Sequence, residues 1–448
     1  MLALSTMNIP AGVPTRCVSF GRGAIEGLTL TLGVAGIAAT TAGRATRCLL
    51  VCDANTRPIA ERAAALLAAA KFDCRQAVLR PDEHGHVPGS IEQVRDVANQ
   101  AADVDVILGV GSGVLNDLGK LASKFADCWY VSIATAASMN GYGSPIAAIV
   151  EDGVKKTLPA AATLAIVADL DVIAAAPIDM TRSGFADLLS KASATTDWRL
   201  ASLVRGEHYD PRPNELLQPV VSACQRDAAA IGRADPDALG LLMQGLIYGA
   251  FAMTLAGSSS PASGGEHLLS HYWDMQAYAR GTKHYLHGYQ VAFGTRLCCA
   301  LYQRLLSLRP DEIDVDVRAK AWVTWDVRRA ALQTAHGDLF GAIEPEAKKQ
   351  FQTRDELRRE LQQIHDNWDV IVTTLKPMTE TPQAMRQWLT EAGVPMSPAA
   401  VGQTPASVRH TLVHAADVRA RFTVLDLARQ LGVLPGHADE LMAECGLA

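Results

Sequence analysis

The first third of the chain alternates short apolar runs with alanine-rich stretches of helical period. The run "RCLLVCD" (47–53) has the length and composition of a buried strand, and "NTRPIAERAAALLAAAKF" (55–72) after it has the composition of a helix. This alternation predicts a parallel sheet flanked by helices. Further strands are predicted at 72–80, 104–111, 129–135 and 163–173, and a further helix at 90–103 with Ser90 as its N-cap.

The pattern changes after Pro177, where β-branched runs become rare and Ala, Leu, Arg and Glu recur at helical spacing. A chain of 448 residues exceeds one ordinary hydrophobic core and suits about two domains. We therefore predict a Rossmann-like α/β domain at 1–177 and an all-α domain at 178–448.

Charge and cysteine content exclude several classes of protein. The formal charge of −6 provides no basic surface for nucleic acid or anionic membrane, and 20% charged residues are typical of a globular chain. The nine cysteines are scattered, without a Cys-x-x-Cys pair. The apolar stretch 27–43 is broken by Gly and Thr, and the N-terminus lacks a signal-peptide pattern. We expect a cytoplasmic protein with reduced thiols.

The motif "GVGSGVLNDLGK" (109–120) follows a predicted strand and opens a helix. Backbone N–H groups at such a helix start, together with the helix dipole, can hold a phosphate. The spacing differs from a Walker A loop and from the usual Gly-x-Gly-x-x-Gly dinucleotide motif. The alternative is that these glycines only permit tight packing. Asp53, at the end of a strand, either binds a ribose or caps the following helix.

A second group of polar residues has the spacing of a metal site. Asp187 lies among apolar neighbours, where a carboxylate is costly unless it is paired or binds a cation. His267 and His271 are four residues apart and share a helical face, and His287 begins another predicted helix. One carboxylate with two imidazoles suits a zinc-like divalent ion. The alternative is an ordinary hydrogen-bonded or solvated face, and for His284 we expect a surface position.

Together these motifs resemble the superfamily of iron-type alcohol dehydrogenases, glycerol dehydrogenases and dehydroquinate synthases. The series is most similar to the sn-glycerol-1-phosphate dehydrogenase family. In order along the chain it reads "GVGSGVLNDLGK", "ATAASMNGYGSP", "GVKKTLPAAATLAIVADLDVIAAAP", "SGFADLLSKASATTDWRLA", "SGGEHLLSHYWD" and "LHGYQVAFGT". The resemblance spans about 106–295 and implies a dehydroquinate synthase-like fold.

The resemblance also implies roles for single residues. Asp187, His267 and His287 would hold the catalytic metal, with zinc as the first choice and nickel or iron as alternatives, while His271 would face substrate. Asp53 would meet the adenosine ribose of an NAD or NADP cofactor. The rest of the cofactor site would be formed by Gly111, Ser112, Gly113, Val114, Leu115, Thr135, Ser138 and Ser144. The substrate would be a small phosphorylated triose or polyol, and the enzyme a homo-oligomer, dimeric or larger.

One residue departs from the family pattern. Where the family commonly reads Ser-x-Asp-Gly, this chain reads "SMNG", so Asn140 replaces a carboxylate expected to contact substrate. An amide can hydrogen-bond a hydroxyl but cannot act as a base. This leaves an unphosphorylated alcohol or polyol as an alternative substrate. A cyclase of the dehydroquinate synthase kind and a binding protein without catalysis are further alternatives. Lys155, Lys156 and Lys191 are candidates to bind a substrate phosphate.

Overall fold

The computed structural model describes residues 6–151 and 154–447. The chain forms two compact units, one of residues 1–188 with 212–258 and the other of residues 189–211 with 259–448. This division differs from the predicted single boundary after residue 177. The helices of 212–258 return to the α/β unit, because tertiary packing and not helix content decides which core a helix joins.

The first unit is built around a six-stranded sheet with the order β1-β10-β7-β6-β4-β5, in which every neighbouring pair is parallel. Its central strands are buried on both faces, which is why they read as continuous apolar runs. The strands are β1 (Cys17–Gly21), β4 (Arg47–Asp53), β5 (Asp73–Leu79), β6 (Val106–Gly111), β7 (Trp129–Ala134) and β10 (Thr163–Asp169).

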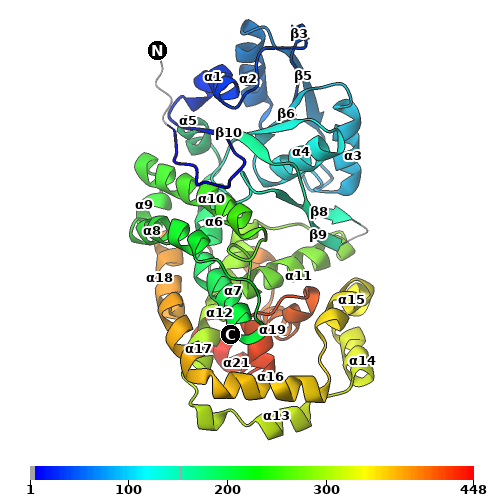
Figure 1. Cartoon of the computed structure of the whole chain (residues 1–448), viewed down its shortest axis with the longest axis vertical. Coiled ribbons are helices and arrows are strands. Elements are labelled where there is room, and N and C mark those ends of the chain that lie inside the picture. Colours follow the sequence, from blue (N-terminus) through cyan, green and yellow to red (C-terminus); the bar gives the residue numbers. More distant parts are fainter. Residues whose placement is uncertain (1–5, 152–153, 448) are drawn as a thin grey trace. The chain divides into compact units, whose positions relative to one another are not determined.

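Helices cover both faces of this sheet (Figure 1). Alternate residues of β4 enter opposite cores: Leu50 packs with α1 (Leu28–Val34) and α2 (Arg57–Ala69), and Leu49 packs with α3 (Ile91–Gln100) and α4 (Gly113–Phe125). Ser90 caps α3 by accepting a hydrogen bond from the N–H of Gln93 at 3.4 Å, which confirms the predicted N-cap. The predicted parallel sheet between helical layers is confirmed.

The order of the strands creates a crevice at the carboxyl edge of the sheet. From β4 the chain passes to β5 on one side and then crosses back to β6 on the other side. Neighbouring connections therefore leave the sheet in opposite directions between β4 and β6, which defines a topological switch point. Open parallel sheets bind ligands at such points, beyond the carboxyl ends of the strands. Asp53 ends β4 and Gly111 ends β6, so both residues lie at this edge.

One local prediction was wrong, and several strands were not predicted. The strand predicted to run to Ile173 ends at Asp169, whose carboxylate accepts from the N–H of Asp171 at 3.0 Å and starts α5 (Leu170–Ala174). The apolar residues beyond Asp169 therefore belong to a helix, because an N-cap acid ends the strand pattern. Strand β1 and the antiparallel hairpin of β8 (Ile146–Glu151) with β9 (Val154–Pro159) were not predicted. Another unpredicted antiparallel pair joins β2 (Thr40–Thr41) and β3 (Arg44–Ala45).

Among the described residues, one helix of the first unit, α10 (Pro236–Ala256), is long and apolar enough to span a membrane by length and composition. Its most apolar window is 72% buried within the protein, and α10 packs against α8. Core helices of soluble proteins pass the same test. The other helices of this unit are α6 (Ile178–Leu189), α8 (Arg212–Arg226) and α9 (Ala228–Ile231).

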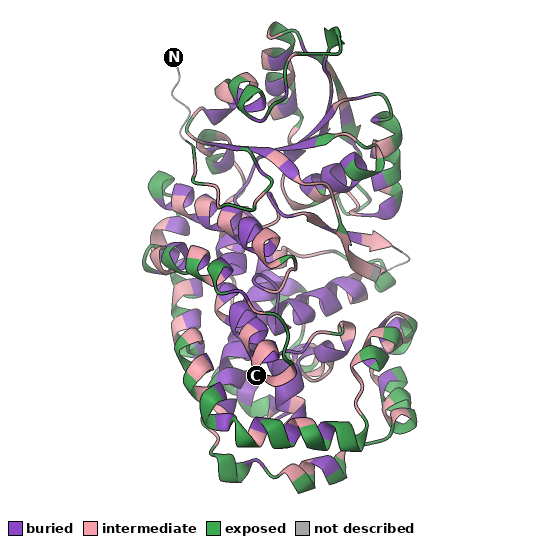
Figure 2. Ribbon diagram, viewed as in Figure 1, coloured by how far each residue is buried: buried purple, intermediate pink, exposed green. Residues whose placement is uncertain are grey.

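The second unit is helical in its described residues, as predicted for this part of the chain. Helices α11 (Gly265–Arg280) and α12 (His287–Leu305) are its buried centre (Figure 2). Around them lie α7 (Lys191–Arg205), α13 (Val315–Ala321), α14 (Trp325–His336), α15 (Phe340–Gln350), α16 (Arg354–Asp366), α17 (Trp368–Leu375), α18 (Pro382–Glu391), α19 (Pro405–His414), α20 (Val424–Gln430) and α21 (Ala438–Glu444). The helices after α12 are mostly amphipathic, with exposed outer faces.

Candidate active site

The glycine motif forms the turn between β6 and α4. Gly111 cannot carry a side chain, because a Cβ there would lie 2.3 Å from Cδ1 of Leu115. At Gly113 a Cβ would meet only Met139, at 3.6 Å, which is an ordinary contact. Tight packing therefore explains Gly111 but not Gly113. The first three N–H groups of α4 have no partner within the helix, and Val114 in this turn is 43% exposed. The turn has the features of a phosphate-binding helix start.

Asp53 takes part in the start of α2. Its Oδ1 accepts hydrogen bonds from the backbone N–H of Thr56 at 2.8 Å and from the Thr56 hydroxyl at 3.0 Å. Asp53 thus orders the turn that precedes α2, through the N-cap residue Thr56, without bonding an N–H group of the helix itself. A role toward a ribose remains a prediction, which the position of Asp53 at the switch point supports.

The loop after β7 carries the other predicted cofactor residues. Thr135 and Ser138 are buried beside the glycine turn: the N–H of Thr135 donates to the Gly111 carbonyl at 3.3 Å, and the hydroxyl groups of Ser138 and Ser112 hydrogen-bond each other. Ser144 instead accepts from the ammonium group of Lys120 at 3.2 Å. The contacts bring Ser112, Thr135 and Ser138 together, whereas the known contacts of Ser144 are internal to the fold.

Lys120, at the end of the glycine motif, is fully buried and organises this loop. Its Nζ donates to the carbonyl oxygens of Gly141 at 2.9 Å and Ile146 at 2.6 Å, and it lies 3.0 Å from a carboxylate oxygen of Asp117. Burial lowers the pKa of Lys120, and Asp117 opposes that shift. Sequence reasoning missed this structural role, although a lysine within an apolar helix face was the available signal.

We expect Lys120→Met to reduce the free energy of unfolding by about 3 kcal/mol, since it leaves buried acceptors and Asp117 without their partner. Urea denaturation measures the change. Lys124→Met is the matched control one turn later on α4, where the lysine is exposed, and it should shift stability by less than about 0.5 kcal/mol. Equal effects of the two substitutions would contradict the role assigned to Lys120.

Asp187 lies in the last turn of α6 and is 1% exposed. Asn140 donates to it twice, from its backbone N–H to Oδ2 at 3.2 Å and from Nδ2 to Oδ1 at 3.3 Å. The residue that departs from the family pattern therefore orients the carboxylate of Asp187. A carboxylate at position 140 could not donate this side-chain hydrogen bond. Whether Asn140 also contacts a substrate remains a prediction.

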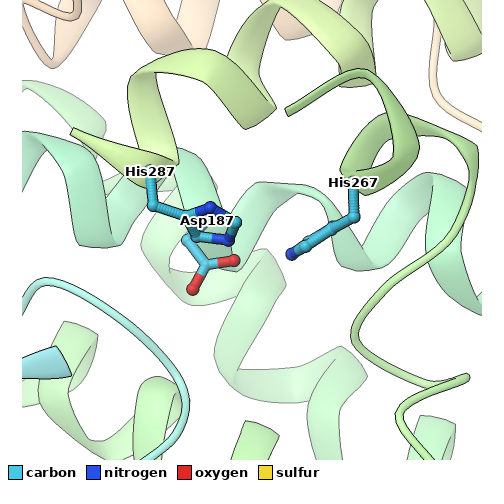
Figure 3. Close-up of side chains that lie close together, drawn as sticks. All are labelled: Asp187, His267 and His287. Atoms are coloured by element: carbon cyan, nitrogen blue, oxygen red, sulfur yellow. The ribbon is translucent and has the colours of Figure 1, made fainter. Parts of the chain in front are cut away.

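His267 and His271 lie on α11, and His287 is the first residue of α12. The ring centres of His267 and His287 are 5.0 Å apart, and each lies about 6 Å from the ring of His271 (6.1 and 6.3 Å). One ligand atom each from Asp187, His267 and His287 lies within 4.8 Å of the other two (Figure 3). The structure thus brings together the three predicted metal ligands, with His271 beside them. His284 lies outside this trio, partly exposed and 3.9 Å from Asp274.

Hydrogen bonds select the same tautomer for both candidate imidazole ligands. The carboxylate of Glu266 accepts from Nδ1 of His267 at 2.7 Å. The hydroxyl of Ser270 donates to Oε1 of Gln290 at 2.7 Å, so it accepts from Nδ1 of His287 at 3.1 Å. With its proton on Nδ1, a neutral imidazole has its lone pair on Nε2. Both rings therefore have the form that a metal requires, each with an outer partner.

A buried pair of acids lies behind His267. Glu266 is fully buried and accepts from Ser193 at 2.7 Å and from the N–H of Gly264 at 2.6 Å. Burial alone would raise its pKa, but these hydrogen bonds and His267 lower it overall. Asp197 accepts from the N–H of Gly265 at 2.7 Å, and burial together with the charge of Glu266 raises the pKa of Asp197 to about 7. Sequence reasoning missed both acids, although Glu266 directly precedes His267.

The raised pKa of Asp197 predicts a pH dependence of stability. Between the unfolded value of 3.8 and a folded value of about 7, only the unfolded chain loses this proton, so rising pH favours unfolding. We expect the free energy of unfolding of the metal-free protein to fall across this range relative to Asp197→Asn, and the difference to level off above pH 7. Urea denaturation at several pH values measures it. A difference that is constant with pH would contradict the assignment.

The candidate phosphate-binding lysines lie in different environments. Lys156 pairs with Glu151 at 2.9 Å within the β8–β9 hairpin, which also carries Lys155. Lys191 is buried and donates to the hydroxyl of Ser190 at 3.0 Å and to the carbonyl of Ala262 at 3.2 Å. The contacts of Lys191 and Lys156 are already internal to the protein. A phosphate role for any of the three remains a prediction.

This chain is similar in sequence to a known family of proteins. The pattern of the family described as iron-containing alcohol dehydrogenase matches residues 32–177. A glycerol-1-phosphate dehydrogenase (NAD(P)+) of Halalkalibacterium halodurans is 35% identical over 263 residues, 57% of this chain and 64% of the relative. A protein of the same name from Bacillus licheniformis is 25% identical and covers 86% of this chain and 84% of the relative. The chain is a relative of the iron-containing alcohol dehydrogenases.

This chain has the same fold as the glycerol dehydrogenase from Schizosaccharomyces pombe, whose structure is known. The TM-score is 0.56 at 15% identity, with 96% of this chain and 91% of the other covered. The resemblance and the fold class predicted from the sequence are thereby confirmed. The matched region spans less than two thirds of the H. halodurans protein.

Proposed function

We propose that the protein is a metal-dependent, NAD(P)-linked dehydrogenase that interconverts dihydroxyacetone phosphate and sn-glycerol 1-phosphate. The observation that carries the proposal is the trio of Asp187, His267 and His287, with both imidazoles held in the ligand tautomer. The named relatives support the substrate. In the direction of reduction, the ketone takes a hydride from NAD(P)H and a proton from the protein or solvent, giving the alcohol and NAD(P)+.

The residues present fit a divalent metal. Two neutral imidazoles and one carboxylate form a donor set that zinc, nickel and iron all accept. The outer partners Glu266, Ser270 and Asn140 orient the three ligands, as in other protein metal sites. A metal held there would act as a Lewis acid toward the substrate carbonyl. We propose zinc first, with nickel or iron as alternatives.

The chain's own residues would supply binding and proton transfer. The turn 111–115 would bind the cofactor diphosphate at the start of α4, and Thr135 and Ser138 would line the adjoining surface. Asp53 would accept hydrogen bonds from the ribose hydroxyls, an arrangement that favours NAD over NADP. His271, buried beside the two ligand histidines, would hydrogen-bond the substrate or relay its proton, since imidazole titrates near neutral pH.

The proposal includes a cytoplasmic homo-oligomer acting on a small molecule. The nine cysteines are all free thiols, as expected of a protein in a reducing compartment. The number of subunits is part of the proposal and is measured by light scattering.

Oxidation of NADH or NADPH, followed by absorbance with dihydroxyacetone phosphate as substrate, tests the function. We expect turnover that stops after chelation and returns when a divalent metal is added. Activity unaffected by chelator, in protein shown to be metal-free, would overturn the metal mechanism. Cofactor consumption equal to product formed would exclude a cyclase, which regenerates its cofactor.

The second candidate is an alcohol or polyol dehydrogenase that acts on an unphosphorylated substrate. The change of Asp to Asn at position 140 motivated it, and the contact between Asn140 and Asp187 gives that change another explanation. Comparing kcat/KM for dihydroxyacetone and its phosphate separates the two candidates. Equal values would favour the second candidate.

A further inference from the structure

A second cluster of potential ligands lies within the helical unit, on elements apart from Asp187, His267 and His287. His336 ends α14, His414 ends α19, and Asp417 lies in the short 3-10 helix Ala415–Val418 that follows. One ligand atom from each lies within 4.8 Å of the other two. Oδ2 of Asp417 is 3.4 Å from Nε2 of His336 and 4.0 Å from Nδ1 of His414. His336 and Asp417 are buried.

Hydrogen-bond partners lie on both sides of the His336 ring. Nδ1 of His336 lies 3.1 Å from the hydroxyl of Tyr272, which also lies 3.2 Å from Nε2 of His410. Nε2 of His336 lies 3.4 Å from Oδ2 of Asp417. In the tautomer with its proton on Nδ1, His336 donates to the Tyr272 hydroxyl and presents the Nε2 lone pair toward the carboxylate of Asp417.

The other two groups face the same point. Nδ1 of His414 is buried and has no hydrogen-bond partner within the described part of the chain. The guanidinium groups of Arg328 and Arg429 both donate to Oδ1 of Asp417, at 2.5 and 2.8 Å, and leave Oδ2 toward the histidines. Two imidazole nitrogens and one carboxylate oxygen thus converge within 4.8 Å of one another. A cation between them would replace the proton shared by His336 and Asp417 and would give the buried Nδ1 of His414 a partner.

We propose that His336, His414 and Asp417 form a second site for a divalent transition metal such as zinc. Bonds of about 2.0–2.2 Å in tetrahedral geometry place neighbouring ligand atoms about 3.4 Å apart. The separation between His336 and Asp417 matches that spacing, and His414 must move closer by a few tenths of an ångström. The His414 side chain is 23% exposed, which provides a route for the ion and a position for a fourth ligand from solvent.

The surroundings support the ligands and also limit the affinity. Tyr272 behind His336, and the two arginines behind Asp417, are the outer hydrogen-bond partners that metal ligands in proteins have. The arginine charges are offset by Asp417 and by Asp426, which pairs with Arg429 at 3.0 Å. The two guanidinium groups nevertheless draw on the charge of Asp417, which weakens the attraction of that carboxylate for the ion. We therefore expect this site to bind more weakly than that of Asp187, His267 and His287.

Metal stoichiometry of the full-length protein tests the proposal. Chelator-treated protein is titrated with Co²⁺, bound metal is measured by mass spectrometry, and the visible spectrum reports coordination. We expect two ions per chain in the wild type and one in either His267→Ala or His414→Ala. In His414→Ala the stronger site should retain its affinity for Co²⁺, and dehydrogenase activity should be unchanged. His365→Ala, at a partly exposed histidine on α16, is the control and should retain both ions.

Three results would overturn the second site. These are a wild-type stoichiometry of one, a stoichiometry of zero in His267→Ala, or the same stoichiometry in His414→Ala as in the wild type. The first would mean that a proton rather than a metal lies between His336 and Asp417. Thermal unfolding of each variant shows whether that variant is folded. Where a variant is not folded, the metal stoichiometry of the wild type still tests the second site.

Discussion

His267→Ala is expected to lower kcat/KM for dihydroxyacetone phosphate by about a thousandfold, equivalent to roughly 4 kcal/mol of transition-state stabilisation. The substitution removes one of the two proposed imidazole ligands and leaves the carboxylate of Glu266 buried without its hydrogen-bond donor, Nδ1 of His267. Metal content at the stronger site should fall in parallel with activity. Steady-state kinetics and metal analysis of the same preparation measure the two effects together.

His284→Ala is the matched control, because it removes a histidine of the same sequence segment that lies outside the ligand trio. It should retain metal and activity within about twofold. If His267→Ala kept both the metal and the activity of the wild type, His267 would not be a ligand and the proposed mechanism would fail. Loss of activity with full metal retention would instead assign His267 a role in binding substrate.

Gly184→Ala should destabilise the first unit by about 3 kcal/mol or more, or prevent folding. A Cβ at this position of α6 would lie 1.9 Å from the carbonyl oxygen of Ala137, so the helix and the loop after β7 would have to separate. The same helix carries Asp187 one turn later, and the same loop carries Ser138 and Asn140. We therefore expect reduced metal affinity in whatever folded protein remains. Urea denaturation and metal titration measure the two effects.

Gly33→Ala is the control for this prediction. Gly33 is also a helical glycine, but a Cβ there would meet no atom within 4 Å. Alanine should be neutral or stabilising by up to about 1 kcal/mol at that position, because it reduces the freedom of the unfolded chain. A Gly184→Ala protein as stable as Gly33→Ala would show that α6 can move away from the loop at little cost.

Local sequence was sufficient to predict a strand or helix of the first unit where a segment carried a single pattern, either an apolar run or an N-cap. The apolar run 47–53 and the N-cap Ser90 were placed correctly, because burial and capping act over a few residues. The prediction at 163–173 was wrong where Asp169 changes a strand into a helix within one apolar run. Strand β1 was missed because its partner β10 comes about 150 residues later in the chain, and no local pattern reports such a pairing.

The residue types of the candidate site were also visible in the sequence, and the ordered motifs gave them roles through the family resemblance. The partners of these residues were not visible. The sequence predicts that Asn140 contacts substrate, and the structure adds that it donates to Asp187. No pattern in the sequence indicated that Glu266 and Asp197 form a buried pair behind His267. The cluster of His336, His414 and Asp417 was not anticipated, since about 80 residues separate His336 from the other two.

The sequence by itself determined the fold class, the glycine turn and the identity of the candidate metal ligands. It did so because strand burial, helical periodicity and ordered motifs are properties of short segments. Only the tertiary structure decided which glycines serve packing, which nitrogen of each histidine is available to a metal, and which polar side chains hold the ligands in place. Those features depend on hydrogen bonds and close approaches between segments far apart in the chain, and such contacts leave no periodic signal in either segment.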